Sequence, residues 1–146
     1  MPRLSDKDRK KARDKLQRPA GNVLNGIDVL VAEKFGSLKD LRVGLITNPS
    51  GISRDRRTTI DLLHAAKEVN LVSLFGPEHG IRGSRDGKVE DGGDDKTGLR
   101  GRSLFAGTDR RKPMKGTLAE VDALVLGMRD FGCRCYTNTS TMGFAL

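Results

Sequence analysis

Three short apolar runs constrain the fold of this 146-residue chain more than any other feature. Each is rich in aliphatic or β-branched residues and is followed by a proline, a glycine or a charged pair, which is typical of strands. The runs are Arg42–Asn48 (RVGLITN), Leu71–Phe75 (LVSLF) and Val121–Met128 (VDALVLGM). Because they are apolar throughout rather than alternating, we expect a parallel sheet that is covered by helices on both faces.

The segments around the first two runs have helical spacing. Apolar residues recur every three or four positions after Asn25, and Gly36 is a suitable stop, so a helix is predicted between them. A second helix, capped by Ser53 or Asp55, is predicted to run to about Lys67. The order helix, strand, helix, strand indicates an α/β fold.

The second half of the chain has a less regular pattern. Residues 84–103 are polar and glycine-rich, which predicts an excursion over the surface. A short helix is predicted at 116–120, and the last residues predict a helix that is capped by Thr139 or Ser140. Three strands make a thin version of a parallel sheet.

The net charge of +8 is unevenly distributed. Residues 1–20 hold eight Lys or Arg against three Asp, a net charge of +5, so only +3 remains for the other 126 positions. Residues 1–22 are therefore predicted to form a basic, flexible tail. A nucleic-acid-binding arm is the alternative, although one Tyr, five Phe and no Trp provide little aromatic surface for stacking on bases.

Composition argues against several other classes of protein. No apolar run approaches the roughly 18 residues of a membrane span, and the charged N-terminal residues differ from a signal peptide. We expect a soluble, cytoplasmic protein. Cys133 and Cys135 are separated by one residue, a spacing that rarely closes a disulfide, and the sequence around them lacks further zinc ligands.

Polar side chains follow all three predicted strands. They lie in Thr47–Asn48, in Pro77–His79 and in Arg129–Asp130. Ligands of open parallel sheets bind beyond the carboxyl ends of the strands, so these side chains form a candidate site if the strands are neighbours. On position alone, LFGPEHGIRG is equally well explained as a structural turn.

Eight blocks of the sequence, in this order and spacing, resemble the N-terminal half of the exo-acting β-N-acetylmuramidase family of bacteria. The most characteristic are LFGPEHGIRG and the final STMGFAL. The other blocks are GIDVLVAEKFGSL, RVGLITN, TTIDLLHAA, DDKTGL, SLFAG and VDALVLGMRDFGCRCYT. The resemblance implies a Rossmann-like catalytic domain and a glycoside hydrolase of peptidoglycan. Such an enzyme releases N-acetylmuramic acid from the non-reducing ends of cell-wall fragments, and the resemblance implies neither a metal nor a cofactor.

The resemblance also suggests catalytic residues. Glycosidases generally need one carboxyl group as acid and a second group as nucleophile or base. Glu78 is the candidate acid/base, because it lies in the PEHG block of this resemblance and at a strand end. The apolar neighbours Phe75 and Pro77 are expected to raise its pKa. Asp130 is the candidate second carboxylate or a ligand of a sugar hydroxyl. We expect Arg129 to lower the pKa of Asp130.

Four further residues are candidates for substrate binding. His79 can orient Glu78 or bind the sugar, with a purely structural role as the alternative. Arg82 has a planar fork that suits the lactyl carboxylate of muramic acid, with a surface charge as the alternative. Asn48 and Tyr136 complete this set of candidates.

The sequence departs from the family pattern in places. Pro49 follows Asn48 where the family has a histidine, Met128-Arg129 replaces an isoleucine-glutamine pair, and Cys135 replaces an aromatic residue. Family members also continue well beyond this length. Residues 23–146 are therefore predicted to be a partial catalytic domain without the smaller C-terminal domain, with an open strand edge. It is active together with a separately encoded C-terminal half, or it is a truncated non-catalytic remnant or a sugar-binding module.

Overall fold

The computed structural model describes residues 23–77, 80–83, 91–104, 116, 118–130, 132 and 137–145. The basic tail and the candidates Glu78, His79 and Tyr136 lie outside these residues, as do Cys133 and Cys135. Within the described ranges, no helix has both the length and the apolar character needed to cross a membrane.

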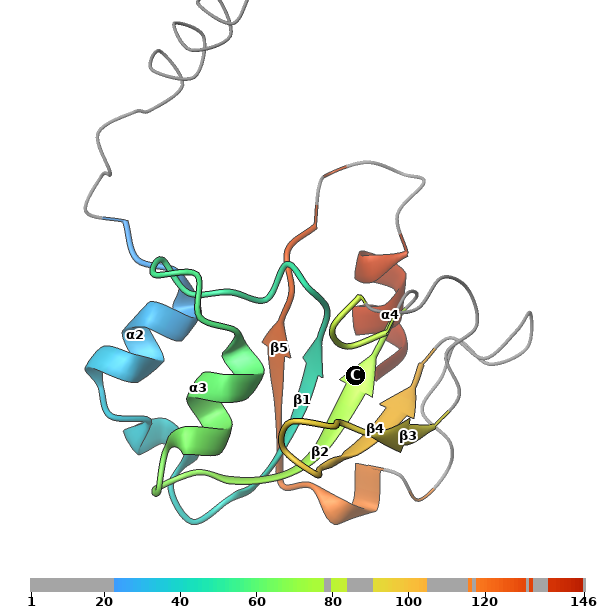
Figure 1. Cartoon of the computed structure of the whole chain (residues 1–146), viewed down its shortest axis with the longest axis horizontal. Helices are drawn as coiled ribbons and strands as arrows, with labels where there is room; N and C mark the ends of the chain where they lie inside the picture. The colour runs from blue at the N-terminus through green and yellow to red at the C-terminus, as the bar shows by residue number, and fades with distance from the viewer. Residues whose placement is uncertain are drawn as a thin grey trace, which may run out of the picture.

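The fold is α/β, as predicted, with a five-stranded sheet in the order β3-β4-β2-β1-β5 (Figure 1). Four strands are parallel, and β3 pairs antiparallel with β4. The strands are β1 (Arg42–Thr47), β2 (Asn70–Gly76), β3 (Gly92–Gly93), β4 (Arg100–Ser103) and β5 (Ala123–Gly127). The helices are α2 (Gly26–Ala32), α3 (Thr59–Ala65) and α4 (Asn138–Ala145), with 3₁₀ turns η1 (Gly36–Leu38) and η2 (Leu118–Glu120).

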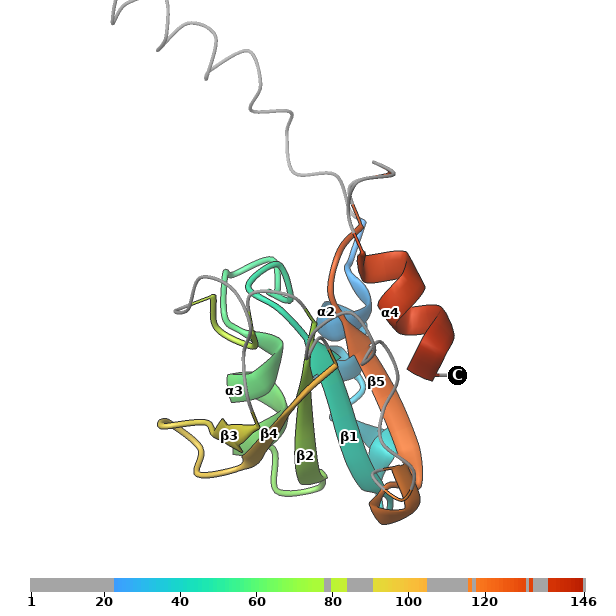
Figure 2. The same cartoon turned by 90° about the vertical axis from the view of Figure 1, so that its right-hand side faces the viewer.

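Helices cover both faces of the sheet, which explains why its central strands are apolar throughout. In β1, Val43 and Leu45 are fully buried against one face, where α2 and α3 pack. Ile46 points to the other face and clusters with Ala145 of α4. Figure 2 shows α3 and α4 on opposite sides of the sheet. Burial on both faces is the reason why no polar alternation exists in these strands.

One predicted helix end and two predicted helix caps are wrong. The first helix ends at Ala32 instead of running to Gly36, because Lys34 and Phe35 adopt positive φ values of 51° and 57°. Thr139 and Ser140 lie inside α4 and are not its cap.

The predicted cap of the second helix is also wrong. Neither Ser53 nor Asp55 caps α3. The cap is Thr58, whose hydroxyl accepts a hydrogen bond from the backbone N–H of Asp61 at 3.2 Å. Ser53 instead closes a tight loop, in which its N–H donates to the Arg57 carbonyl at 2.8 Å and its hydroxyl accepts from the Arg57 N–H at 3.1 Å.

The polar segment 84–103 contains structure that its composition does not reveal. Residues 84–90 lie outside the described residues, but β3 and β4 fall in the remainder. The strand β4 has the sequence RGRS and pairs in parallel with the end of β2. Backbone groups alone make this pairing, so no apolar pattern is needed to form it.

Candidate functional site

The loops that follow β1, β2 and β5 leave the sheet at the same end, where the carboxyl ends of these parallel strands lie. These three strands are neighbours in the order β2-β1-β5 and run parallel, as the candidate site requires. The end of β1 therefore lies between the ends of β2 and β5 (Figure 1). The expected convergence of the three strand ends is confirmed.

The ends of β1 and β5 are tied together by direct hydrogen bonds. The Ser50 hydroxyl donates to Asn48 Oδ1 at 2.5 Å and accepts from the backbone N–H of Arg129 at 2.8 Å. One strand position earlier, the Thr47 hydroxyl donates to the Gly127 carbonyl at 2.6 Å. Gly51 lies so close to the end of β5 that a Cβ atom added to it would collide with the Gly127 carbonyl. The loop after β1 is thus held against β5.

Asp130 lies at the other side of this junction, and each of its carboxylate oxygens accepts one hydrogen bond. Its Oδ2 accepts from the Thr139 hydroxyl at 2.7 Å, and its Oδ1 accepts from the backbone N–H of Gly132 at 2.6 Å. These two hydrogen bonds, that of Thr139 above all, lower the pKa of Asp130. An ionised carboxylate therefore joins the end of β5 to α4.

The predicted direction of the Asp130 pKa shift is confirmed, but the predicted cause is wrong. The guanidinium of Arg129 does not contribute to it. Its Nη2 donates instead to the Ile52 carbonyl at 3.2 Å, across the junction between β5 and the loop after β1. The Arg129 side chain is thus engaged with the loop after β1.

The loop after β2 is anchored on both sides of Glu78 and His79. Pro77 is fully buried, and the N–H of Gly80 donates to its carbonyl at 3.1 Å. Gly80 has a φ of 77°, a conformation that favours glycine. Gly83, at a φ of 67°, lies against Pro49, whose Cγ atom would be only 2.6 Å from a Cβ atom added to this glycine. This contact places the loop after β2 beside the loop after β1.

Arg82 is held by two carboxylates in the structure. Its Nε and Nη2 bind the two oxygens of Asp94 at 2.5 and 2.9 Å, and Nη2 also donates to Asp61 of α3 at 3.1 Å. Asp94 is nearly buried, with 4% of its side chain exposed. Its hydrogen bonds from Arg82 lower its pKa to about 2. Lys96 adds a second cation to Asp61 at 2.5 Å.

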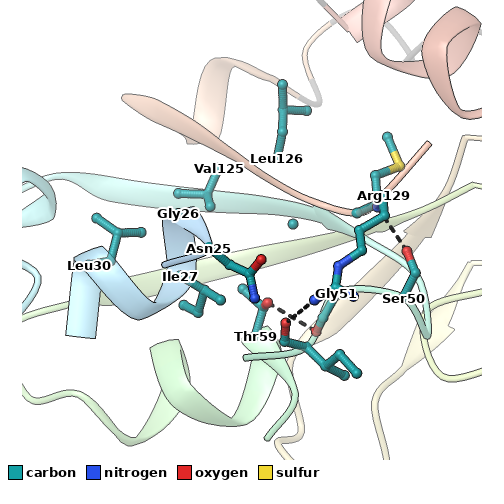
Figure 3. A pocket seen from close by; sticks show the side chains of 13 residues that line it. Asn25, Gly26, Ile27, Leu30, Ser50, Gly51, Thr59, Val125, Leu126 and Arg129 are labelled. Carbon is teal, nitrogen blue, oxygen red and sulfur yellow. Dashed lines mark hydrogen bonds between the residues drawn. The ribbon is translucent and has the colours of Figure 1, made fainter. Parts of the chain in front are cut away.

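A cavity of about 400 Å³ adjoins the junction of β1 and β5 (Figure 3). One wall is apolar and comes from α2 and β5, while the other is polar and comes from the loop after β1 and from Arg129. Its lining includes Ile27, Leu30, Ser50, Val125, Leu126 and Arg129. Within the described ranges, no three His, Cys, Asp or Glu side chains are grouped closely enough to hold a metal ion.

The sequence analysis did not predict three residues whose side chains make hydrogen bonds near the carboxyl ends of the strands. Ser50 sits in a Pro-Ser-Gly turn, where only its turn propensity was visible. Asp61 and Asp94 belong to a helix and a polar loop, and their common partner Arg82 is 21 and 12 positions away. Long-range pairing of this kind leaves no local pattern in a sequence.

Comparison with known proteins identifies a family. A sequence model described as "Exo-beta-N-acetylmuramidase NamZ, N-terminal" matches residues 43–146. The chain is 40% identical over 126 residues to the peptidoglycan β-N-acetylmuramidase NamZ of Bacillus subtilis. It also resembles two crystal structures of DUF1343 family proteins from Bacteroides fragilis. Their TM-scores are 0.75 and 0.63, at 47% and 29% sequence identity over 84% and 82% of this chain.

The matches cover only part of each relative. The aligned region is 85% of this chain but 30% of the Bacillus protein, and it is 30% and 29% of the two Bacteroides structures. The chain thus spans about a third of the length of these relatives.

Proposed function

Because the chain belongs to the exo-β-N-acetylmuramidase NamZ family through its N-terminal part, we propose that it is the catalytic part of a glycosidase. The enzyme would release N-acetylmuramic acid from the non-reducing ends of peptidoglycan fragments. The observation that carries this proposal is the convergence of three strand ends within the matched residues 43–146. Each of these ends bears candidate polar residues.

Glu78 is proposed as the acid that protonates the leaving oxygen. It follows Pro77, which is fully buried, and Phe75, which is buried on the α4 face of the sheet. A carboxyl group in apolar surroundings keeps its proton to higher pH, which a general acid requires. His79, the next residue, is proposed to orient Glu78 or to bind the sugar.

Asp130 is proposed as the ionised partner of Glu78. Hydrogen bonds from Thr139 and Gly132 lower its pKa, so it carries a negative charge under the conditions in which Glu78 is to remain protonated. This division between a neutral and an ionised carboxyl is the arrangement that glycosidases use. Asp130 then serves as nucleophile, as base for water or as ligand of a sugar hydroxyl.

Three further residues are proposed to contact the sugar. Asn48 Oδ1 accepts two hydrogen bonds from Ser50, at 3.0 Å from the backbone N–H and at 2.5 Å from the hydroxyl, so its Nδ2 is the group directed to a sugar oxygen. Arg82 is proposed to bind the lactyl carboxylate in competition with Asp61, whose 3.1 Å bond is the weaker of its two pairings. Tyr136 is proposed to stack on the sugar or to bond it.

The division of the chain and its setting are also proposals. Residues 1–22 form a basic tail, and residues 23–146 form a partial catalytic domain that works with a separately encoded C-terminal half. The matched region is 30% of the Bacillus relative, so most of that protein lies outside the match. A cytoplasmic location is part of this proposal.

Release of N-acetylmuramic acid from a chromogenic muramide tests the proposed activity. The assay uses the chain together with the part of the Bacillus relative that follows the matched segment. Glu78→Gln is expected to lower turnover by about 10²–10⁴-fold, the usual contribution of general acid catalysis. Glu68→Gln is the matched control. Glu68 is exposed and precedes β2, so it lies near the amino ends of the strands, away from the candidate site.

Two results would contradict the proposal. Unchanged turnover in Glu78→Gln would remove Glu78 from the acid role. No turnover by the wild-type pair, in a preparation that melts cooperatively and binds muramic acid, would leave a sugar-binding module without catalysis.

A further inference from the structure

Two of the three nitrogen atoms of the Arg82 guanidinium are occupied by carboxylates of the chain. Nε donates to Asp94 Oδ1 at 2.5 Å, and Nη2 donates to Asp94 Oδ2 at 2.9 Å and to Asp61 Oδ1 at 3.1 Å. Within the part of the chain that the structure describes, Nη1 makes no hydrogen bond, and it is not buried. Because Nη1 carries two N–H groups, Arg82 keeps donors for a ligand.

Asp94 is a fixed partner for this guanidinium. Only 4% of its side chain is exposed, and its Oδ2 also accepts hydrogen bonds from the Thr97 hydroxyl at 2.6 Å and from the Thr97 N–H at 3.0 Å. The backbone N–H of Asp94 donates to the Leu99 carbonyl at 2.8 Å. Because both the carboxylate and the backbone of Asp94 are held, its bidentate pair with Arg82 sets the plane of the guanidinium.

Asp61 is a weaker partner of Arg82 and has a second cation of its own. Its Oδ2 accepts a hydrogen bond from Lys96 Nζ at 2.5 Å, so its charge stays paired when Oδ1 separates from Arg82. A carboxylate that takes the place of Asp61 can bind Nη1 and Nη2 together. This is the bidentate geometry in which a guanidinium recognises a carboxylate best.

A cavity next to Asp61 provides room for such a ligand. Its volume is about 550 Å³. Among the lining residues that the structure describes, three are Lys or Arg and one is Asp, namely Arg56, Arg57, Lys96 and Asp61. The excess of positive charge attracts a negatively charged ligand to this cavity.

We infer that Asp94 is a positioning residue, which holds one edge of the Arg82 guanidinium so that the other edge binds a carboxylate of the ligand in place of Asp61. The ligand is then a sugar acid and not a neutral sugar. Asp94 and Asp61 have opposite effects on binding, because the first orients the donor and the second competes with the ligand. The inference rests on the proposed function for the choice of muramic acid, whose lactyl carboxylate is the group that Arg82 recognises.

Binding of N-acetylmuramic acid and of its neutral lactyl methyl ester to the full chain tests the inference. Titration calorimetry measures both affinities, and their ratio reports on the carboxylate. The wild-type chain is expected to bind the acid about tenfold more tightly than the ester, the usual contribution of a hydrogen bond to a charged group. Asp94→Asn is expected to abolish this preference through weaker binding of the acid, with binding of the ester unchanged. Asp61→Asn is expected to increase the preference by about two- to fivefold, because a competing charge is removed.

Asp95→Asn is the matched control, since it removes the same charge at the exposed neighbouring position and is expected to keep the wild-type ratio. Thermal melts establish that each variant is folded. If Asp94→Asn does not fold, Asp61→Asn decides the test by itself, and a ratio at or below that of the wild-type chain overturns the inference.

Three other results overturn the inference as well. One is a wild-type chain that binds acid and ester equally or binds neither. Another is an Asp94→Asn variant that loses affinity for acid and ester to the same extent, which indicates a purely structural role. The third is an Asp94→Asn variant that binds the acid more tightly, which indicates an effect of charge alone.

The turnover assay with the chromogenic muramide separates this inference from the proposed function. The expected affinity ratios in the absence of any release of muramic acid support the positioning role and remove the function. Release of muramic acid by a protein whose ratio is the same in Asp94→Asn, Asp61→Asn and the wild-type chain has the opposite meaning.

Discussion

The hydroxyl of Ser50 accepts a hydrogen bond from the backbone N–H of Arg129, 79 positions away in the sequence, at 2.8 Å. The same hydroxyl donates to Asn48. One side chain therefore couples the candidate binding residue after β1 to the segment after β5. The position of Asn48 relative to Asp130 depends on this short connection.

Ser50→Ala is expected to lower the free energy of unfolding by about 1–2 kcal/mol, because it removes two hydrogen bonds from a partly buried junction. Urea unfolding at neutral pH measures the change. Ser37→Ala is the control, since Ser37 lies exposed in η1 and its removal is expected to change stability by less than about 0.5 kcal/mol. Equal effects of the two substitutions would show that the junction contributes nothing.

Gly51→Ala is expected to prevent the close approach of the loop after β1 to β5. The new Cβ would meet the Gly127 carbonyl and the Thr47 hydroxyl, which themselves form a hydrogen bond. Destabilisation of about 2 kcal/mol or more is expected from such a backbone collision, measured by thermal or urea unfolding. Gly36→Ala is the matched control, because a Cβ atom added there would have no other atom within 4 Å. If Gly51→Ala unfolded at the same temperature as the wild-type chain, the close contact between Gly51 and Gly127 would be refuted.

Asp94→Asn is expected to reduce stability and to flatten its dependence on acid. The pKa of Asp94 falls from 3.8 to about 2 in the folded chain, because Arg82 and Thr97 bind its charged form. A lowered pKa contributes stability that is complete above the unfolded pKa near 3.8 and is lost as the pH falls toward about 2. The shift corresponds to about 2 kcal/mol at neutral pH.

Urea unfolding at several pH values between 2 and 7 measures this contribution. The wild-type chain is expected to lose stability between pH 4 and pH 2, and Asp94→Asn is expected to lose less over the same interval. Some dependence remains in the variant, because the pKa of Asp61 is also lowered. Asp95→Asn, a change at the exposed neighbouring position, is the control and is expected to keep the wild-type profile.

Thr139→Val is expected to raise the pKa of Asp130 toward its ordinary value, since the Thr139 hydroxyl is the main cause of the lowered pKa. Carbon-13 NMR of the aspartate carboxyl groups, followed through an acid titration, measures the shift. Asp28 is an internal control, because its pKa is lowered chiefly by the backbone N–H of Arg54. Identical Asp130 titrations in the two proteins would show that α4 does not hold this carboxylate.

The core strands of the sheet could be predicted because burial on two faces leaves a strong local signal. Val43, Leu45 and Ile46 are all fully buried, so the whole run is apolar. The strand β4 could not be predicted, because RGRS pairs with β2 through backbone groups. Helix ends were missed where the deciding feature was a backbone dihedral, as at Lys34 and Phe35, or a competing loop, as at Ser53.

The candidate site, like the fold, could be predicted only in part. The placement of Asn48 and Asp130 at the same end of the sheet could be predicted, because both directly follow apolar runs that form parallel strands. The pairing of Arg82 with Asp94 and Asp61 could not be anticipated, since its partners come from another loop and from α3. The cause of the lowered Asp130 pKa was also invisible, because Thr139 lies nine positions away on α4.

The sequence by itself determined the α/β class, the three apolar strands of the sheet and the ordered blocks that identify the family, because these depend on burial patterns and on residue order along the chain. Only the tertiary structure decided that β1 lies between β2 and β5 and that Ser50 joins two strand ends. These features arise from contacts between residues far apart in the sequence, and the free energy of such contacts depends on distance and direction in space.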